Sequence, residues 1–488
     1  MFMKTYLKLF VCVIALLVTA CSDEFFEVNQ DPNGPTRTTP ENMLPNVIQE
    51  TMHLQDVAAV SSTSATNQLA NTSTGSLREI DSYGPSGYAA SLFQNNYFWF
   101  GINNEKMMEW AQEEGSYHYV GVAKILKAIN FAYTLDTHGT LYYQDAFDPQ
   151  VTQHTFDDGE FVYNQLLSLL DEAIIDLDRD SFRPLSQGDI LYNGDVEKWK
   201  MLAYAEKARI LNHLTKKSSY NPQAVLAAVD NSFKQVSDEA AYDFTGEPLS
   251  DRTQGATGGF GFTALLSLKT WDKVLVDYLK GEGNGGIADP RLSSIVNPGS
   301  DGQYRGVTNG VSRDGLNPEL IGPVVGGFYS SPDSKYFIFS YEELKLIEAE
   351  AAFLSGDVSR AYTAYQTAIR TNMERMAITA SEIEEYLTNN PAAAVSASAL
   401  TLGKIMFQKY VTMVFHPEVW VDMRRYDYDP SIYPGFSLPD NVNSALNGEF
   451  IRRIDMFNAE IQFNKAEVER IGGLLPDYKS KRVWWDQP

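Results

Sequence analysis

Apolar residues recur at steps of three and four along most of the chain. In one stretch the repeating positions are Val162, Leu166, Leu169, Ala173 and Leu177. This spacing places the side chains on one helical face, so it predicts an amphipathic helix with a single apolar stripe. The acidic residues at 157–160 offer an N-cap and a negative charge that favours a helix N-terminus. We therefore expect a helix to begin at this point.

Two further stripes flank a short turn. The positions are Leu344, Ile347, Ala351 and Leu354 before Ser355-Gly356-Asp357, and Ala361, Tyr365 and Ala368 after it. The second set has the spacing of the second helix of a tetratricopeptide repeat, and Ala349 occupies the small position of the first helix. Small residues let paired helices approach closely, and the aromatic residue fills the gap to the next pair. No clean period of 34 residues recurs elsewhere, so we expect degenerate repeats.

Two stretches interrupt the helical pattern. Residues 61–97 are rich in Ser, Thr, Asn, Gly and Tyr, and residues 245–334 are rich in glycine with few apolar stripes. Long loops on a rigid scaffold are common places for binding sites. The pattern therefore predicts a mainly α fold that carries an irregular, loop-rich binding lobe.

The N-terminus has the pattern of an export signal. Lys4 and Lys8 precede the uncharged apolar run from Leu9 to Ala20. Twelve helical residues span about 18 Å, which is too short for a hydrocarbon core of roughly 30 Å. We interpret residues 1–20 as a signal peptide. The segment ending in Thr19-Ala20-Cys21 resembles the bacterial lipobox, which implies lipidation of Cys21; the alternative is an ordinary signal peptide.

The residues after Cys21 are typical of a tether. Ser22-Asp23-Glu24 is similar to the acidic surface-export signals of Bacteroidetes lipoproteins. Residues 29–41 are rich in Asn, Asp, Pro and Thr, which favour turns over helix. We expect a lipidated tether over residues 21–41 and a globular domain over residues 42–488, with lipid as the only membrane anchor.

Charge and cysteine content exclude several classes of protein. The 488 residues include 39 Lys and Arg against 63 Asp and Glu, a net charge of −24. Loss of the signal peptide would remove two lysines and leave 37 against 63, or −26. Such a chain repels phosphate backbones, so nonspecific nucleic-acid binding is excluded. The two cysteines, at positions 12 and 21, leave no disulfide framework or cysteine-ligated metal site in the body.

No catalytic or cofactor motif stands out. The six histidines include no i,i+4 pair and no H-E-x-x-H pattern, and the chain has neither a G-x-S-x-G elbow nor a Walker A sequence. We expect no enzymatic activity, no metal site and no cofactor. A carboxylate pair for glycoside hydrolysis remains an alternative, because nothing marks any two of the 63 acidic residues.

Aromatic residues make up 12% of the chain and crowd the end of the first loop-rich stretch. Flat aromatic faces stack on sugar rings, and nearby polar groups bond to the hydroxyls. The candidate ligand-binding residues are Arg78, Tyr83, Tyr88, Asn96 and Trp99. We assign Phe98 and Phe100 to the core; for Tyr83, Tyr88 and Trp99 the core and ligand interpretations both stay open.

Short motifs follow one another in order along nearly the whole chain. They are Asp31-Pro32-Asn33; Leu135-Asp136-Thr137-His138-Gly139 and onward to Phe147; Tyr192-Asn193-Gly194-Asp195 with Lys198-Trp199; Asp289-Pro290-Arg291-Leu292; Tyr341–Ala351; Gln408-Lys409-Tyr410; Glu418-Val419-Trp420 with Arg424-Arg425; Arg452-Arg453-Ile454; and Val483-Trp484-Trp485-Asp486. The ordered set resembles the SusD/RagB family of Bacteroidetes nutrient-binding lipoproteins. Thr140, Tyr142 and Met456-Phe457 depart from the family pattern at local turns.

The resemblance implies a fold and a partner. The fold would be SusD-like, with tetratricopeptide-like helical pairs and an irregular ligand-binding lobe. The partner would be a SusC-like, TonB-dependent outer-membrane barrel on which the protein sits as a lid. We therefore expect a lipid-anchored, surface-exposed binding protein that captures a nutrient such as a glycan. The alternatives are a surface glycoside hydrolase and a repeat scaffold for outer-membrane assembly; the motifs do not identify the ligand.

Overall fold

The computed structural model describes residues 37–71, 80–84, 91–243, 266, 269–283, 285–311, 317–331 and 333–488. The chain divides into two units, residues 1–39 and 40–488, and everything below concerns the second. The expected signal peptide, the lipidation site Cys21 and most of the tether lie outside the described residues. The candidate residues Arg78 and Tyr88 lie outside them as well.

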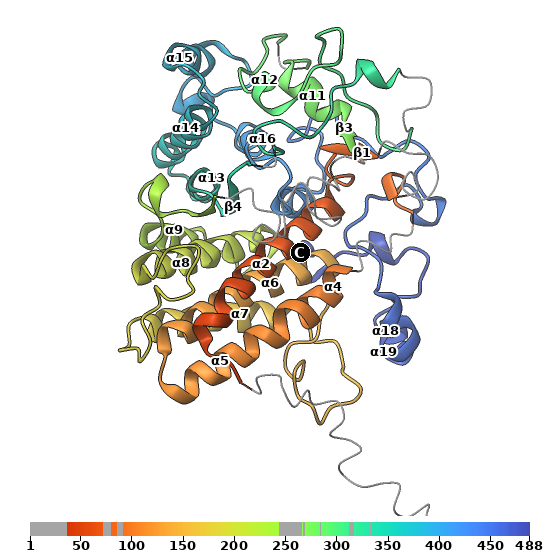
Figure 1. Ribbon diagram of the computed structural model, residues 1–488. Coiled ribbons are helices and arrows are strands. Elements are labelled where there is room, and N and C mark those ends of the chain that lie inside the picture. Colours follow the sequence, from red (N-terminus) through yellow and green to blue (C-terminus); the bar gives the residue numbers. More distant parts are fainter. Residues whose placement is uncertain are drawn as a thin grey trace, which may run out of the picture. The chain divides into compact units, whose positions relative to one another are not determined.

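The second unit is mainly helical (Figure 1). Its α-helices are α2 (Pro40–Ser62), α4 (Ser91–Asn95), α5 (Ile102–Glu114), α6 (Tyr117–His138), α7 (Gly159–Leu177), α8 (Val196–His213), α9 (Pro222–Asn231), α11 (Lys273–Leu279), α12 (Leu292–Ile295), α13 (Tyr341–Leu354), α14 (Val358–Arg375), α15 (Ala380–Asn389), α16 (Leu402–Thr412), α17 (Glu418–Arg425), α18 (Asn458–Phe463) and α19 (Lys465–Arg470). Short 3₁₀ turns are η4 (Leu214–Lys216), η5 (Val236–Asp238), η6 (Pro318–Leu320), η7 (Ala397–Ala399), η8 (Ser444–Leu446), η9 (Tyr478–Ser480) and η10 (Trp484–Asp486), and η3 (Asn96–Gly101) is a π-helix.

Strands are few and short in the described part. β1 (Leu69–Asn71) pairs antiparallel with β3 (Lys269–Trp271), with Ala70 opposite Thr270. β2 (Ala240–Tyr242) pairs antiparallel with β4 (Tyr336–Phe339). Both pairs join segments that are far apart in sequence: β1–β3 links the two loop-rich stretches to each other, and β2–β4 pairs the segments on either side of the second stretch. The first of those stretches ends in helix earlier than the sequence suggests, because α4 begins at Ser91.

Successive helices pack as neighbouring pairs. α6 packs on α7, α8 on α9, and α13 on α14, while α7 with α8 and α9 with α13 join the pairs into one series. In the last pair, Ser340 and Asp357 accept backbone N–H groups as N-caps, and Gly356 adopts φ +85° in the turn between. This arrangement confirms the predicted tetratricopeptide-like pairs.

The predicted apolar stripes are buried, with two exceptions at their edges. Asp158 caps α7 through its side chain, and four of the five stripe residues are buried. Leu169 is only half-buried because Leu170 takes the core position. In α13 the last stripe residue, Leu354, is 40% exposed where the helix ends.

The family-like motifs form buried polar networks in the scaffold. Glu350 of α13 accepts hydrogen bonds from Arg425 on both carboxylate oxygens, at 2.6 and 3.0 Å. Lys409 of α16 contacts Glu350 at 3.2 Å and Asp422 at 2.8 Å. A buried charge is costly unless it is paired and hydrogen-bonded. Three motifs distant in sequence therefore meet here for structural reasons.

A second network has the same character. Arg291 pairs with Asp289 at 2.7 Å and donates to Gln408 at 2.8 Å. Elsewhere Trp199 donates its indole N–H to Asp189 at 2.8 Å. All of these groups are buried, so these motifs specify the scaffold and not a ligand site.

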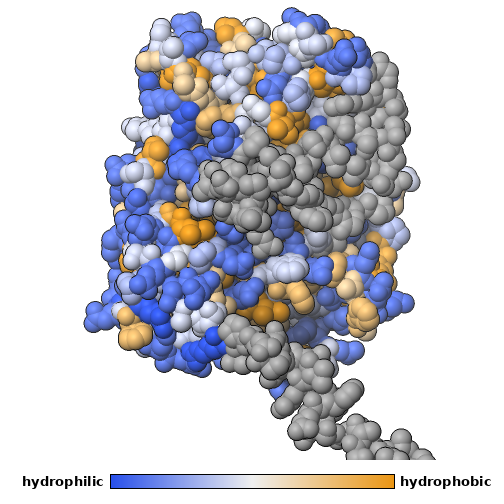
Figure 2. All heavy atoms as spheres, in the orientation of Figure 1, coloured by the Kyte–Doolittle hydropathy of each residue, from blue (hydrophilic) through white to orange (hydrophobic). Residues whose placement is uncertain are grey.

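The face shown in Figure 2 is largely hydrophilic, with apolar residues in small separate patches. None of the helices in the described part of the chain combines the length and apolar character that crossing a membrane requires.

Candidate functional site

A single π-helical turn lies between α4 and α5. It spans Asn96–Gly101, and the N–H of Ile102 bonds to the carbonyl of Tyr97, five residues earlier. π-Helical turns are uncommon and occur frequently at functional sites. The turn includes Phe98-Trp99-Phe100. Because a π-helical turn holds one residue more than an α-helical turn, it changes the directions in which these aromatic side chains point.

Tyr97 fastens this turn to the segment after α6. Its hydroxyl donates to the carbonyl oxygen of Tyr142 at 2.7 Å and accepts the N–H of the same residue at 2.7 Å. Burial raises the pKa of Tyr97 well above its ordinary value, so the hydroxyl keeps its proton at neutral pH. The ring packs against Phe93 and Phe131, with centroids 5.0 and 5.7 Å away. The π-helical turn is thus held on a rigid base.

Gly101 is the last residue of the turn and lies in close contact with Phe147. A Cβ atom at this position would lie 2.5 Å from Cζ of Phe147 and 2.7 Å from the carbonyl oxygen of Asn96. Only glycine leaves room for Phe147 to lie against the helix. Phe100 is fully buried beside it.

Phe98 and Trp99 project from this base into solvent, 60% and 49% exposed. Their rings meet edge to face with centroids 5.8 Å apart, and Asn103 donates to the carbonyl oxygen of Trp99 at 2.8 Å. We call Phe98 and Trp99 the aromatic ledge. The core assignment is confirmed for Phe100 but wrong for Phe98, because the π-helical turn rotates that ring outward.

The other described candidates are not on this surface. Tyr83 is 1% exposed and adopts φ +61°, and Asn96 is fully buried. Neither side chain offers a face to a ligand arriving from solvent, so neither belongs to the candidate site. Among the predicted residues that the structure describes, Trp99 alone is placed to stack on a ligand.

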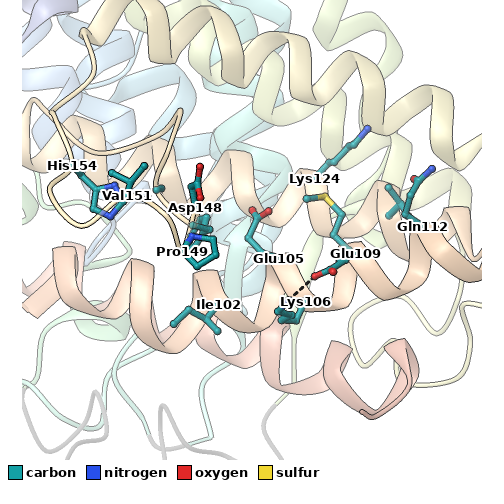
Figure 3. Close-up of a pocket in the computed structure, with 14 residues that line it drawn as sticks. Ile102, Glu105, Lys106, Glu109, Gln112, Lys124, Asp148, Pro149, Val151 and His154 are labelled. Carbon is teal, nitrogen blue, oxygen red and sulfur yellow. Dashed lines mark hydrogen bonds and ion pairs between the residues drawn. The ribbon is translucent and has the colours of Figure 1, made fainter. Parts of the chain in front are cut away.

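A cleft of about 690 Å³ begins at Ile102, one turn beyond the ledge. Figure 3 shows α5 forming one side, α6 contributing Lys124, and the segment 146–154 closing one end. We call it the α5 cleft. Along α5 the residues that line it include Ile102, Glu105, Lys106, Glu109 and Gln112. The opposite helical face, with Met107 and Ala111, is buried in the core.

The lysine side chains in and behind the α5 cleft each pair with a carboxylate. Lys106 contacts Glu109 at 2.7 Å, and Lys124 contacts both Glu172 and Asp176 at 2.8 Å. Lys127, behind the cleft, contacts Glu105 at 2.6 Å. Phe147 supplies an aromatic wall. The cleft therefore combines apolar surface with fixed hydrogen-bonding groups, as small-molecule sites do.

Within the described residues, one cluster has the composition of a metal site. Ligand atoms of Asp136, His213 and Glu418 lie within 4.8 Å of one another, and all three residues are buried. Tyr163 and Trp485 already donate to Asp136, and His213 Nε2 lies 2.6 Å from Glu418. Burial alone would lower the pKa of His213, but the carboxylates of Glu418 and Asp136 raise it. The imidazolium thus fills the place that a cation would take.

Comparison of this chain with known protein families identifies the family to which it belongs. A family model described as "Starch-binding associating with outer membrane", SusD-like, matches residues 32–455. The chain belongs to the SusD-like family. Members of this family are nutrient-binding proteins associated with the outer membrane. No curated protein sequence matches the chain.

Solved SusD-like structures share the fold. A chitin-binding protein is 22% identical, with a TM-score of 0.75 over 92% of this chain and all of that one. A SusD/RagB family protein from Bacteroides thetaiotaomicron is 20% identical, with a TM-score of 0.70 over 92% and 99%. A SusD homologue from Bacteroides fragilis is 18% identical, with a TM-score of 0.73 over 92% and 100%. The SusD-like fold expected from the motifs is confirmed.

Several residues of the site were absent from the sequence prediction. The sequence assigns Phe98 to the core, and neither Ile102 nor Phe147 is among the ligand-binding candidates. The useful signal was the consecutive Phe98-Trp99-Phe100 followed by Gly101, because three neighbouring aromatic residues cannot all face one core.

Proposed function

We propose that this SusD-like protein is a surface-exposed lipoprotein, anchored through Cys21, that binds a glycan and passes it to a SusC-like TonB-dependent transporter. The aromatic ledge is the observation that carries the ligand proposal. The two adjoining aromatic rings, 60% and 49% exposed on a rigid base, form a contiguous apolar surface of the kind that marks a ligand-binding site. Their apolar faces match the C–H faces of sugar rings.

The base of the ledge supports this function. Tyr97 and Gly101 hold the π-helical turn against Tyr142 and Phe147, so the two exposed rings lose little further freedom when a ligand binds. The paired carboxylates and ammonium groups of the neighbouring cleft offer acceptors and donors for hydroxyl groups.

The membrane and transporter parts of the proposal rest on the lipobox-like sequence and on family membership. The family is described as associating with the outer membrane, which agrees with a lipid anchor at Cys21. Capture by the ledge and release into a barrel would require opening and closing of the protein on its partner.

Binding by the chain from Ser22 onward tests the ligand proposal. Residues 40–488 form a separate unit, so removing residues 1–21 leaves that unit whole. A panel of oligosaccharides, including chitin and starch fragments, is titrated by calorimetry. Trp99→Ala should weaken binding by about 1–3 kcal/mol, because a desolvated aromatic contact is lost. Phe182→Ala, which removes a 71% exposed ring elsewhere, should bind normally.

The same samples separate the alternatives. A binding protein returns the oligosaccharide unchanged, whereas a surface glycoside hydrolase releases shorter products. Co-purification of the full-length lipoprotein with a TonB-dependent barrel supports capture for transport. Co-purification with an assembly machine and no affinity for any glycan supports the scaffold alternative.

A further inference from the structure

The aromatic ledge and the α5 cleft lie along one helical face. Phe98, Trp99, Ile102, Lys106, Glu109 and Gln112 follow one another at steps of one, three and four residues. Positions three and four apart lie one above the other on a helix. From Ile102 to Gln112 the helix rises about 15 Å, and the ledge adds roughly 5 Å. The exposed strip is therefore much longer than one sugar ring.

The far end of this strip is an open cleft with walls on two sides. The segment 146–154 contributes Phe147, Pro149 and Val151 to the walls, and α6 contributes Val120. Figure 3 shows Pro149 and Val151 on a loop beside α5. A ligand lying on Trp99 can thus continue past Ile102 into an open cleft of about 690 Å³.

The charges of the cleft disfavour an anionic ligand. Glu105, Glu109 and Asp148 place three carboxylates in the lining against the ammonium groups of Lys106 and Lys124. In the described lining, each of these ammonium groups already contacts a carboxylate. A uronic or sulfated sugar would have to displace an ion pair and then meet the remaining acidic groups. Neutral hydroxyl groups can donate hydrogen bonds to the carboxylate oxygens without displacing an ion pair.

We infer that the ligand is a neutral, elongated oligosaccharide that stacks on the aromatic ledge and extends into the α5 cleft. This inference rests on the proposed glycan binding and adds the length and the charge of the glycan. Short neutral sugars fill only the ledge, and longer chains gain contacts along α5.

The test is a length series measured by calorimetry on the chain from Ser22 onward. Neutral oligosaccharides of two to six units come from the glycan that binds best in the panel above, and an anionic series of uronic acid oligomers matches their lengths. We expect the neutral six-unit chain to bind at least tenfold more tightly than the two-unit chain. We expect the anionic series to bind at least tenfold more weakly at equal length.

Three variants test whether the cleft is responsible for the dependence of binding on length and on charge. Val151→Trp fills the cleft and should remove the length dependence of binding. Gln150→Trp alters an exposed neighbour outside the lining and should keep the length dependence. Glu109→Lys adds a cation and should strengthen binding of the anionic series.

The outcomes distinguish the inference from the function on which it rests. If two- and six-unit chains bind equally and both depend on Trp99, the inference is overturned while glycan binding stands. Equal affinity for neutral and anionic chains overturns the charge assignment. If no glycan binds at any length, the proposed function itself is wrong.

Discussion

The hydroxyl of Tyr97 bonds twice to the backbone of Tyr142, donating to its carbonyl oxygen and accepting its N–H at 2.7 Å each. Tyr97 belongs to the π-helical turn that presents the aromatic ledge, and Tyr142 belongs to the segment that continues into the wall of the α5 cleft. One side chain therefore fixes the two halves of the proposed site against each other.

Tyr97→Phe should lower the free energy of unfolding by about 1–3 kcal/mol, because two backbone groups lose their partner in a buried place. Urea denaturation measures this change. Tyr143→Phe is the matched control, since the hydroxyl of Tyr143 makes no hydrogen bond within the described residues. Equal stability of the two variants would show that the Tyr97 hydroxyl does not fasten the turn.

Gly101→Ala should also destabilise the protein, by about 1–3 kcal/mol, because the added Cβ overlaps Phe147 and the carbonyl of Asn96. In the double variant Gly101→Ala/Phe147→Ala, the overlap with the Phe147 ring should be relieved, whereas the overlap with the carbonyl of Asn96 should remain. Thermal denaturation of both single variants and the double variant reveals the coupling. If the double variant loses the sum of the two single losses, Gly101 and Phe147 are not in the predicted contact.

His213→Gln should leave the carboxylates of Asp136 and Glu418 without their buried cation, at a cost of about 3–5 kcal/mol. Because the pKa of His213 is raised, its charged form stabilises the folded state fully below its ordinary pKa near 6.5. That contribution is lost as the pH rises through the higher pKa of the folded state.

The difference in unfolding free energy between the wild type and His213→Gln should thus be largest at pH 6 and shrink toward pH 9. Denaturation at several pH values measures it, and His154→Gln at the cleft edge serves as the control. A difference that stays constant over this range would show that His213 is neutral in the folded protein.

Glu350→Gln should cost about 3–5 kcal/mol near neutral pH, since Arg425 and Lys409 lose their shared carboxylate. Burial would raise the pKa of Glu350, but Arg425 and Lys409 hold it well below its usual range. Its contribution is therefore present above about pH 4.5 and lost as the pH falls toward the lower pKa of the folded state.

Glu384→Gln removes a carboxylate that pairs with Arg370 on the surface, and it should destabilise the protein far less than Glu350→Gln because water screens the exposed pair. Guanidinium denaturation of both variants at pH 7 compares the buried and the exposed pair. Equal losses would contradict the structural role assigned to the Glu350 network.

The scaffold was largely predictable because its signals are local. The stripes around Leu166 and Ile347, the cap at Asp158, and the small residues beside Tyr365 each act within a few turns of helix. The ion cluster was not predictable, because His213 and Glu418 lie 205 residues apart and only the fold brings them together.

The site was predictable only in part. Trp99 was a candidate, but sequence spacing could not show that a π-helical turn exposes Phe98 beside it and buries Phe100. The α5 cleft arises when the segment carrying Phe147 folds back on Gly101, which is a long-range contact that no pattern along α5 reveals.

A crystal structure of the chain from Ser22 onward with its best-binding oligosaccharide tests the central claim most directly. The account predicts a sugar ring stacked on the indole of Trp99 with Phe98 at its edge, and further sugar units following α5 past Ile102. An oligosaccharide bound elsewhere, with the rings of Phe98 and Trp99 still exposed to solvent, would contradict it.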